Sequence, residues 1–242
     1  MRYGIISDIH ANLPALEAVL EGLREVDRVV CLGDIVGYGA DPNQCCDTVR
    51  DLGCPALKGN HDAGVTGELD FSWFNSIAAE ALAWTRRALT ARNLDFLERL
   101  PLQREQDGFL MVHGSPVDPW EYIYDAWGAE RAFSAMQQGL CFFGHTHLAT
   151  AFVADQDGHP VEQVALPEGG CLELRPDRRY LINPGGVGQP RDGNPKASYL
   201  IYDSETRLVE WFRVDYPIAE EQRRMREAGI HECLVERLGV GF

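Results

Sequence analysis

Short apolar runs that stop abruptly at polar residues place the strongest constraint on how this chain folds. Such runs are Tyr3–Ile6, Arg28–Leu32, Ala56–Leu57, Phe109–Val112 and Leu140–Phe143. Continuous apolar runs of this length are typical of strands buried on both faces of a sheet. Helical patterns separate the first three runs: Asn12–Val26, which opens on the N-cap residue Asn12, and Asn43–Leu52. Strands that alternate with helices predict an α/β fold with right-handed crossovers.

The rest of the chain predicts more helices and a second group of strands. Residues 72–100 carry apolar side chains at helical spacing, so we expect one or two helices that pack on the sheet or cap it. Another helix is expected to end within Phe133–Gln138, and Ala219–Leu238 is expected to be helical. After Gly144, antiparallel strands are expected at Ala151–Ala154, Pro160–Val164, Cys171–Leu174, Arg179–Ile182, Ser198–Asp203 and Leu208–Val214. No repeat or linker interrupts the pattern, so we expect one domain over residues 1–242.

The composition excludes several classes of function. The 22 basic and 37 acidic side chains give a formal net charge of −15, which disfavours nucleic acid as a partner. No run of about 18 apolar residues is present, so no membrane span is expected. The seven cysteines are odd in number and form no Cys-x-x-Cys pair, which indicates reduced thiols in a cytoplasmic protein. Nothing in the sequence specifies an oligomeric state.

Most of the histidines come directly after predicted strands. Five of the seven do so: His10, His61, His113, His145 and His147. Asp8, Asp34 and Asn60 occupy matching positions. The carboxyl ends of strands are where open α/β sheets build their sites, so we expect these side chains to converge on one rim. Residues two apart on an extended segment point the same way. Asp8 and His10 would therefore point at one centre, and so would His145 and His147.

The candidate ligands mix nitrogen and oxygen, which suits divalent zinc, manganese, iron or nickel. Seven candidates remain without His61, too many for one tetrahedral ion, so two ions that share a bridging carboxylate are expected. Asp34 is the expected bridge, because Gly33 before it permits a close approach. Each element alone has a simpler explanation: His113 as a core histidine, Asp8 as a helix cap, or residues 60–62 as an Asx turn. Their conjunction favours a metal site.

The same residues form the motif series of a known family. In chain order the blocks are Asp8-Ile9-His10, Gly33-Asp34, Gly59-Asn60-His61-Asp62, Val112-His113-Gly114 and Gly144-His145-Thr146-His147. This series, over residues 1–147, resembles the calcineurin-like metallophosphoesterase superfamily. Its short spacing is most similar to the small bacterial and archaeal phosphodiesterase branch. The segment Asn183–Arg191 resembles the N-P-G-S-x-G-x-P-R stretch of that branch, with Gly186 in place of the serine.

The resemblance implies a particular fold and metal centre. The implied fold is a four-layer αββα sandwich with two mixed sheets and a dimetal site at the strand carboxyl ends. Manganese is the first expectation for both ions, with iron, zinc or nickel as alternatives. The implied ligands are Asp8, His10, Asp34 and His147 for one ion, and Asp34, Asn60, His113 and His145 for the other.

The resemblance also implies a reaction. A hydroxide that bridges the two ions would attack phosphorus in line, while the ions withdraw charge from the phosphoryl oxygens. His61 takes the family position for protonating the leaving oxygen, and Asp62 would orient or tune it. Asn60 belongs to the same catalytic block.

The expected substrate is a small soluble phosphodiester or phosphomonoester, such as a nucleotide. Trp120 and Tyr122, in the aromatic loop 116–128, would stack a nucleobase or else pack against the helical segment. Arg191 would contact a phosphate or else remain a surface charge. The alternatives are a protein serine/threonine phosphatase, a nuclease and a non-catalytic metal-binding scaffold. Scaffold relatives lose ligands or the acid histidine, and here none is lost.

Overall fold

Two mixed β-sheets form the centre of the molecule. The computed structural model describes all 242 residues. One sheet has the strand order β2 (Arg28–Cys31), β1 (Arg2–Ile6), β10 (Ala197–Asp203), β11 (Leu208–Val214), β8 (Gly170–Glu173). The other has the order β3 (Gln103–Gln106), β4 (Phe109–Val112), β5 (Leu140–Phe142), β9 (Arg179–Pro184), β6 (Ala149–Ala154), β7 (Val161–Ala165). Both sheets contain parallel and antiparallel pairs, since β1 is parallel to β2 and antiparallel to β10, and β9 is parallel to β5 and antiparallel to β6.

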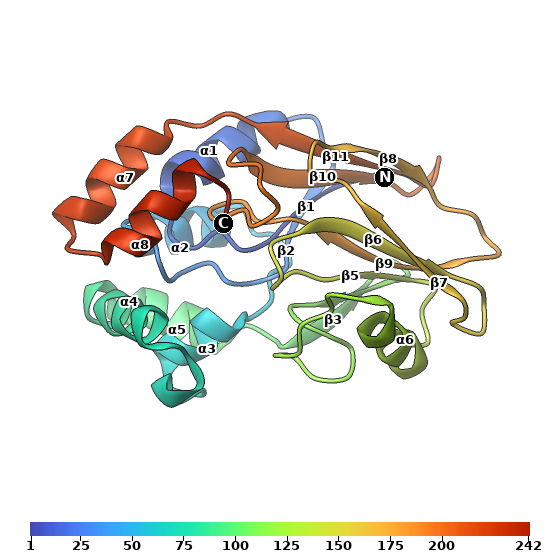
Figure 1. Cartoon of the computed structure of the whole chain (residues 1–242), viewed down its shortest axis with the longest axis horizontal. Helices are drawn as coiled ribbons and strands as arrows, with labels where there is room; N and C mark the ends of the chain where they lie inside the picture. Colours follow the sequence, from blue (N-terminus) through green and yellow to red (C-terminus); the bar gives the residue numbers. More distant parts are fainter.

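Helices cover both outer faces of this pair of sheets (Figure 1). They are α1 (Leu13–Gly22), α2 (Pro42–Asp51), α3 (Asn60–Thr66), α4 (Ser76–Ala88), α5 (Ala91–Glu98), α6 (Ala126–Ala135), α7 (Ile218–Glu227) and α8 (Glu232–Glu236), with the short 3₁₀ turns η1 (Phe71–Trp73) and η2 (Arg237–Gly239). Helices α1 and α2 pack on the five-stranded sheet, and α6 packs on the six-stranded sheet. This order of layers confirms the αββα sandwich. None of the helices has the length and apolar character needed to cross a membrane.

Alternation along the strands builds the layers. Ile5 enters the core between the sheets, whereas Ile6 packs toward α1 and α2. Met111 likewise enters the core between the sheets, and Leu110 packs toward α6. Both faces of these strands are therefore apolar, which explains why the sequence shows continuous apolar runs instead of an alternating pattern.

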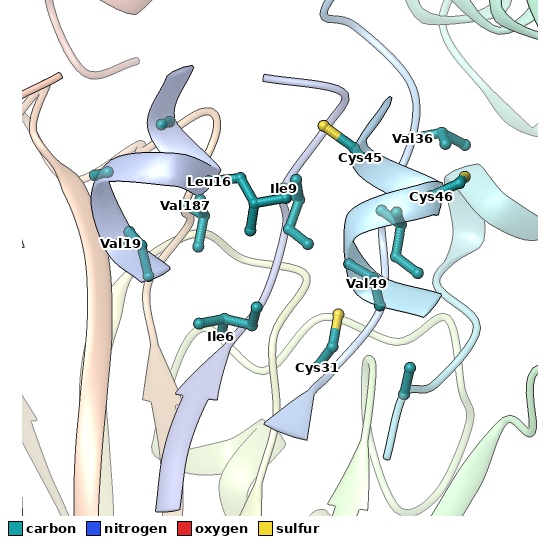
Figure 2. Close-up of a cluster of buried hydrophobic side chains, with 14 of the residues drawn as sticks. Ile6, Ile9, Leu16, Val19, Cys31, Val36, Cys45, Cys46, Val49 and Val187 are labelled. Carbon is teal, nitrogen blue, oxygen red and sulfur yellow. The ribbon is translucent and has the colours of Figure 1, made fainter. Parts of the chain in front are cut away.

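The core under α1 and α2 also anchors the loops that follow β1 and β2 (Figure 2). Ile9, in the loop after β1, packs with Leu16 of α1 and with Val187. Val36, in the loop after β2, packs in the same cluster as Cys46 of α2. The polar residues beside Ile9 and Val36 are thus held by buried apolar neighbours.

The predicted strand Ala56–Leu57 is wrong. Ala56 forms a single parallel bridge to Cys31 and no longer pairing. The reason is local: the amide of Leu57 still donates to Cys31, but the amide of Lys58 already donates to Pro101 on the helical side of the chain.

The region 72–100 forms two helices, α4 and α5, and begins later than expected. Asn75 starts α4 by accepting the amide hydrogen of Ala78 at 3.0 Å, so Trp73 lies outside the helix. Thr90 starts α5 in the same way, by accepting from the amide of Asn93 at 3.3 Å. Each cap satisfies an amide that the first helical turn leaves without a partner.

The C-terminal segment and the later strands also differ in part from their prediction. The helix expected over Ala219–Leu238 is broken at Gly229, whose positive φ of 74° separates α7 from α8. The strands after Gly144 are antiparallel as expected, except that β9 also pairs in parallel with β5. Strand β3 and helix α3 were not predicted at all.

Candidate metal centre

Loops that follow four strands bring the predicted ligands to one edge of the sandwich. The strands are β1 and β2 of one sheet and β4 and β5 of the other. The residues that meet there are Asp8, His10, Asp34, Asn60, His113, His145 and His147, together with His61 at the start of α3. The two sheets therefore contribute to a single site.

Asp8, His10, Asp34 and His147 form the first of two buried groups of ligand atoms, all within 4.8 Å of one another. The Nε2 atoms of His10 and His147 are 3.1 Å apart. His147 Nε2 lies 3.3 Å from Asp8 Oδ1, and His10 Nε2 lies 3.6 Å from Asp34 Oδ2. The set offers two nitrogens and two carboxylates to one point.

The second group shares Asp34 with the first. It consists of Asp34, His113 and His145, again with ligand atoms within 4.8 Å. His113 Nε2 lies 3.5 Å from Asp34 Oδ2 and 3.1 Å from the side-chain oxygen of Asn60. One carboxylate thus stands between two clusters of nitrogen and oxygen atoms.

Backbone carbonyls fix the orientation of three of the imidazole rings. The Nδ1 atoms lie 3.2 Å from the carbonyl of Val36 for His10, 2.9 Å from that of Leu32 for His113, and 2.5 Å from that of Gln189 for His147. A carbonyl only accepts, so each Nδ1 carries the hydrogen, and in the neutral ring each Nε2 has a lone pair that it can present to the centre.

This arrangement leaves acceptors facing acceptors. The lone pairs of His10 Nε2 and His147 Nε2 point at each other across 3.1 Å, and the buried Asp8 Oδ1 has no hydrogen-bond donor. Unpaired buried acceptors cost free energy unless a cation lies among them. The donor set therefore fits a divalent metal ion.

The pKa values of the site point the same way. Burial lowers the pKa of His10, His145 and His147 well below the usual value, so these rings are neutral ligands. Burial opposes charge on Asp34, but His113 and other nearby histidines hold its pKa well below normal. Burial also opposes charge on His113, yet the carboxylate of Asp34 raises its pKa to about 9. The centre thus attracts positive charge even in a buried setting.

Most of the ligand residues have strained backbones. Their φ angles are positive: 56° at Asp8, 49° at His10, 52° at Asp34, 66° at His145 and 60° at His147. Non-glycine residues adopt this region rarely, at a cost of about 1 kcal/mol or more each. Hydrogen bonds between the loops hold it in place, for example from the amide of His10 to the carbonyl of Asp34 at 2.9 Å.

Gly33 permits the close approach of another backbone segment, as expected from the sequence. Its φ is 105°, and a Cβ there would lie 2.6 Å from the amide nitrogen of Gly59. The neighbour that approaches it closely is thus the backbone before Asn60. The absence of a side chain lets the loops that carry Asp34 and Asn60 cross.

His61 lies beside the first group, with its ring centroid 4.8 Å from that of His10 and 4.4 Å from that of Tyr38. Its Nδ1 is buried without a partner, and burial lowers its pKa to about 4. The ring is therefore neutral in the free protein.

Asp62 makes its hydrogen bonds to the backbone and none to the ring of His61. Its carboxylate accepts from the amides of Gly59 at 2.9 Å, Ile35 at 3.0 Å and Val36 at 3.2 Å. These contacts tie the loop after β2 to the start of α3. Asp62 therefore fixes the backbone that carries the ligands and His61.

A cavity of about 320 Å³ opens beside the second group of ligands, where Asn60 and His145 line it. Its walls include Asn60, His61, His145, Trp73, Trp120 and Tyr122. Two of the predicted substrate residues thus line it. Tyr122 is already stacked on the ring of His145, with centroids 3.7 Å apart, and on Tyr124, with centroids 5.0 Å apart.

Arg191, the third predicted substrate residue, does not line this cavity. Its guanidinium bonds to the side chain of Gln189 at 3.2 Å and lies 5.9 Å from the ring of Tyr38. Trp73 was missed as a cavity residue because it sits within an apolar pattern of helical spacing. The Asn75 cap that follows it was the available signal.

Comparisons with known proteins cover nearly the whole chain. The family model for the calcineurin-like phosphoesterase superfamily domain matches residues 1–207. An uncharacterised protein of Methanocaldococcus jannaschii is 41% identical over 245 residues, which is 98% of this chain and 97% of that protein. Phosphodiesterase YfcE of Escherichia coli (strain K12) is 25% identical over 224 residues, which is 86% of this chain and 91% of that protein.

Solved structures agree with these matches. The crystal structure of a metallophosphoesterase from Sphaerobacter thermophilus has a TM-score of 0.89 at 45% identity, with 100% of both chains covered. A hypothetical protein from Pyrococcus horikoshii OT3 shares the fold, with a TM-score of 0.80 at 18% identity over 100% of this chain and 98% of that chain. Motifs, layers and the buried Asp–His groups lead to one conclusion: the chain belongs to the calcineurin-like phosphoesterase superfamily.

Proposed function

We propose that this metal-binding phosphoester hydrolase uses two divalent ions and acts on small soluble phosphodiesters or phosphomonoesters, nucleotides among them. The observation that carries the proposal is that the two buried ligand groups share Asp34, while Asn60 and His145, beside His113 in the second group, line the cavity. One ion would be held by Asp8, His10, Asp34 and His147, and the other by Asp34, Asn60, His113 and His145. Manganese is the ion we expect first, with iron, zinc or nickel as alternatives, since mixed nitrogen and oxygen ligands accept each of them.

Two divalent ions bound at such a centre supply positive charge to the phosphoryl oxygens and lower the pKa of a water molecule held there. His61 lines the same cavity, which supports a role for it at the leaving oxygen. Its pKa is low in the free protein because the ring is buried, but the negative charge of a phosphate favours the protonated form. In this proposal His61 donates a proton to the leaving oxygen, and Asp62 holds the loop backbone that positions it.

The shape of the site favours a small substrate over a phosphoprotein. Trp73 and Trp120 stand on the walls of a cavity of about 320 Å³, which suits a single small group better than an extended peptide. The complete ligand set and the retained His61 argue against a non-catalytic scaffold. The formal net charge of −15 argues against a nuclease.

A metal-reconstitution assay tests this function. Metal-depleted protein is titrated with Mn²⁺, Ni²⁺, Zn²⁺ and Mg²⁺ and assayed on bis-p-nitrophenyl phosphate and p-nitrophenyl phosphate in parallel. We expect metal-dependent turnover, and the ratio of the two rates separates diesterase from monoesterase activity. No turnover of either ester with two metals bound would contradict the proposal.

The Asp34→Asn variant tests the bridging role. It removes the charge that both groups share, so bound metal and activity should fall together. Loss of a group that merely orients a ligand costs about 10–100-fold, so the loss here should exceed about 100-fold. The matched control is Asp51→Asn, an exposed aspartate on α2, which should keep both. Full activity of Asp34→Asn with two metals, counted by elemental analysis, would refute the assignment.

A further inference from the structure

Trp73 is a large aromatic side chain that lies outside the hydrophobic clusters of the core. It is 75% exposed, on the short turn η1, although its neighbours Phe71 and Phe74 both pack against the core. No aromatic ring or cation contacts its indole, whereas the exposed Trp127 packs against Arg131 with 5.0 Å from the ring to the guanidinium. Single exposed apolar residues are common. What distinguishes Trp73 is that it lines the same cavity as Asn60 and His61.

The other aromatic walls of that cavity differ in their availability. Tyr122 is engaged by His145 on one side and by Tyr124, so its ring is not free to receive another ring. Trp120 lines the cavity and has no aromatic partner. The rings of Tyr38 and Phe74, which also line the cavity, both contact His61. Trp73 and Trp120 are therefore the aromatic side chains of the cavity that have no aromatic partner.

The cavity also offers a polar group at its rim. Asn75 lines it, and its side-chain oxygen accepts the amide hydrogen of Ala78 in the cap of α4. The side-chain nitrogen Nδ2 of Asn75 stays available to donate a hydrogen bond. A planar aromatic group with hydrogen-bond acceptors on its edge matches these surroundings better than an aliphatic group does.

From this we infer that the cavity binds the nucleobase of a nucleotide substrate, and that Trp73 is the residue that stacks on it. The inference rests on the proposed function, because it places the phosphate at the metal centre and the base beside it. Trp73 touches the substrate in this arrangement but takes no part in holding metal or moving protons. It therefore sets which phosphoesters bind, and not whether the site can hydrolyse one.

The test compares two ligands that differ only in the base. Adenosine 5′-monophosphate and ribose 5-phosphate are measured as competitive inhibitors of bis-p-nitrophenyl phosphate hydrolysis by the Mn²⁺-loaded protein. Wild type should bind the nucleotide more tightly than the sugar phosphate. Trp73→Ala should weaken nucleotide binding about 5- to 100-fold and leave the sugar phosphate unchanged.

Two further variants control for the fold and for exposed tryptophan in general. Trp73→Phe keeps an aromatic face and should restore most of the nucleotide affinity. Trp127→Ala removes another exposed tryptophan, one outside the cavity, and should change neither inhibition constant. Equal affinities of wild type for the two ligands, or a Trp73→Ala protein that binds the nucleotide as wild type does, would overturn the inference.

The outcome is separable from that of the proposed function. If wild type turns over no ester, the same affinities are measured by titration calorimetry. A selective loss of nucleotide binding in Trp73→Ala would then support the base site while hydrolysis fails. Turnover by wild type with no effect of Trp73→Ala would leave hydrolysis standing and refute the base site.

Discussion

At the scale of single residues, Asp62 carries more of the site than its lack of contact with substrate or metal suggests. Three buried amides donate to its carboxylate, from Gly59, Ile35 and Val36. Asp62→Ala would leave them unpaired, at about 1–3 kcal/mol each, so we expect a loss of about 3 kcal/mol or more in the free energy of unfolding. Metal affinity should fall as well, because these amides flank Asp34 and Asn60. Urea denaturation and metal titration measure both.

A tuning role on His61 predicts a different result for the same variant. Stability and metal affinity would then match wild type, and only the rate with poor leaving groups would fall. Asp51→Ala, which removes an exposed carboxylate on α2, serves as the control and should match wild type in every readout. A fall in the metal affinity of Asp62→Ala would therefore support the backbone-fixing role, and an unchanged metal affinity would support the tuning role.

That the polar residues after the strands meet at one edge was predictable from the sequence, because the carboxyl ends of strands converge there; their role as metal ligands stays a prediction. The groups that hold these side chains in position were not predictable. The carbonyls of Leu32, Val36 and Gln189 that orient the imidazoles are main-chain atoms, which leave no trace in residue type. The same holds for the positive φ angles of Asp8 and of the other strained residues of the site. Such features follow from loops that cross, and only the assembled fold shows them.

At the scale of elements, α7 is tied to the loop after β2 by a buried carboxylate. Glu221 is fully buried and accepts the amide hydrogen of Ala40 at 3.1 Å. Burial raises its pKa to about 7 from an ordinary 4.5, with Asp41 acting in the same direction and Arg224 against it. The folded protein therefore keeps this proton to a higher pH than the unfolded chain, so stability is lost as the pH rises from about 4.5 through about 7.

Glu221→Gln removes this loss while keeping an oxygen for Ala40. We expect the variant to be more stable than wild type by about 1–3 kcal/mol at pH 8 and to differ little at pH 4.5. The control Glu227→Gln, an exposed residue of the same helix, should follow wild type at both pH values. Thermal unfolding across this range would contradict the prediction if Glu221→Gln and wild type showed the same slope against pH.

Elements with strong local signals were predicted well, and those set by distant contacts were not. Helix α1 was anticipated because Asn12 caps it, accepting the amide hydrogen of Ala15 at 3.1 Å. Helix α3 was missed because it is short and begins at Gly59, whose amide donates to Asp62 within the helix. The same carboxylate accepts from the amide of Ile35, 27 residues away, a contact that the sequence does not show. The parallel pairing of β9 with β5 joins segments about 40 residues apart, for which one sequence carries no pattern.

At the scale of the whole molecule, the metal centre joins the two sheets. Asp8, His10 and Asp34 come from the five-stranded sheet, whereas His113 and His147 come from the six-stranded sheet. The core between the sheets already holds them together, so the fold does not need metal to form. The facing lone pairs and the unpaired Asp8 oxygen nonetheless penalise the folded chain when no cation is bound.

Metal removal should therefore lower thermal stability without unfolding the protein. An ion at about a hundredfold excess over its dissociation constant stabilises the native state by about 2.7 kcal/mol. For a chain of this length that corresponds to a rise in Tm of about 5–10 °C, which calorimetry with and without chelator would measure. Asp34→Asn should show a smaller rise, since both ligand groups lose charge, and Asp51→Asn should match wild type. A Tm that is the same with and without Mn²⁺ would mean that the two sheets are not joined through a metal.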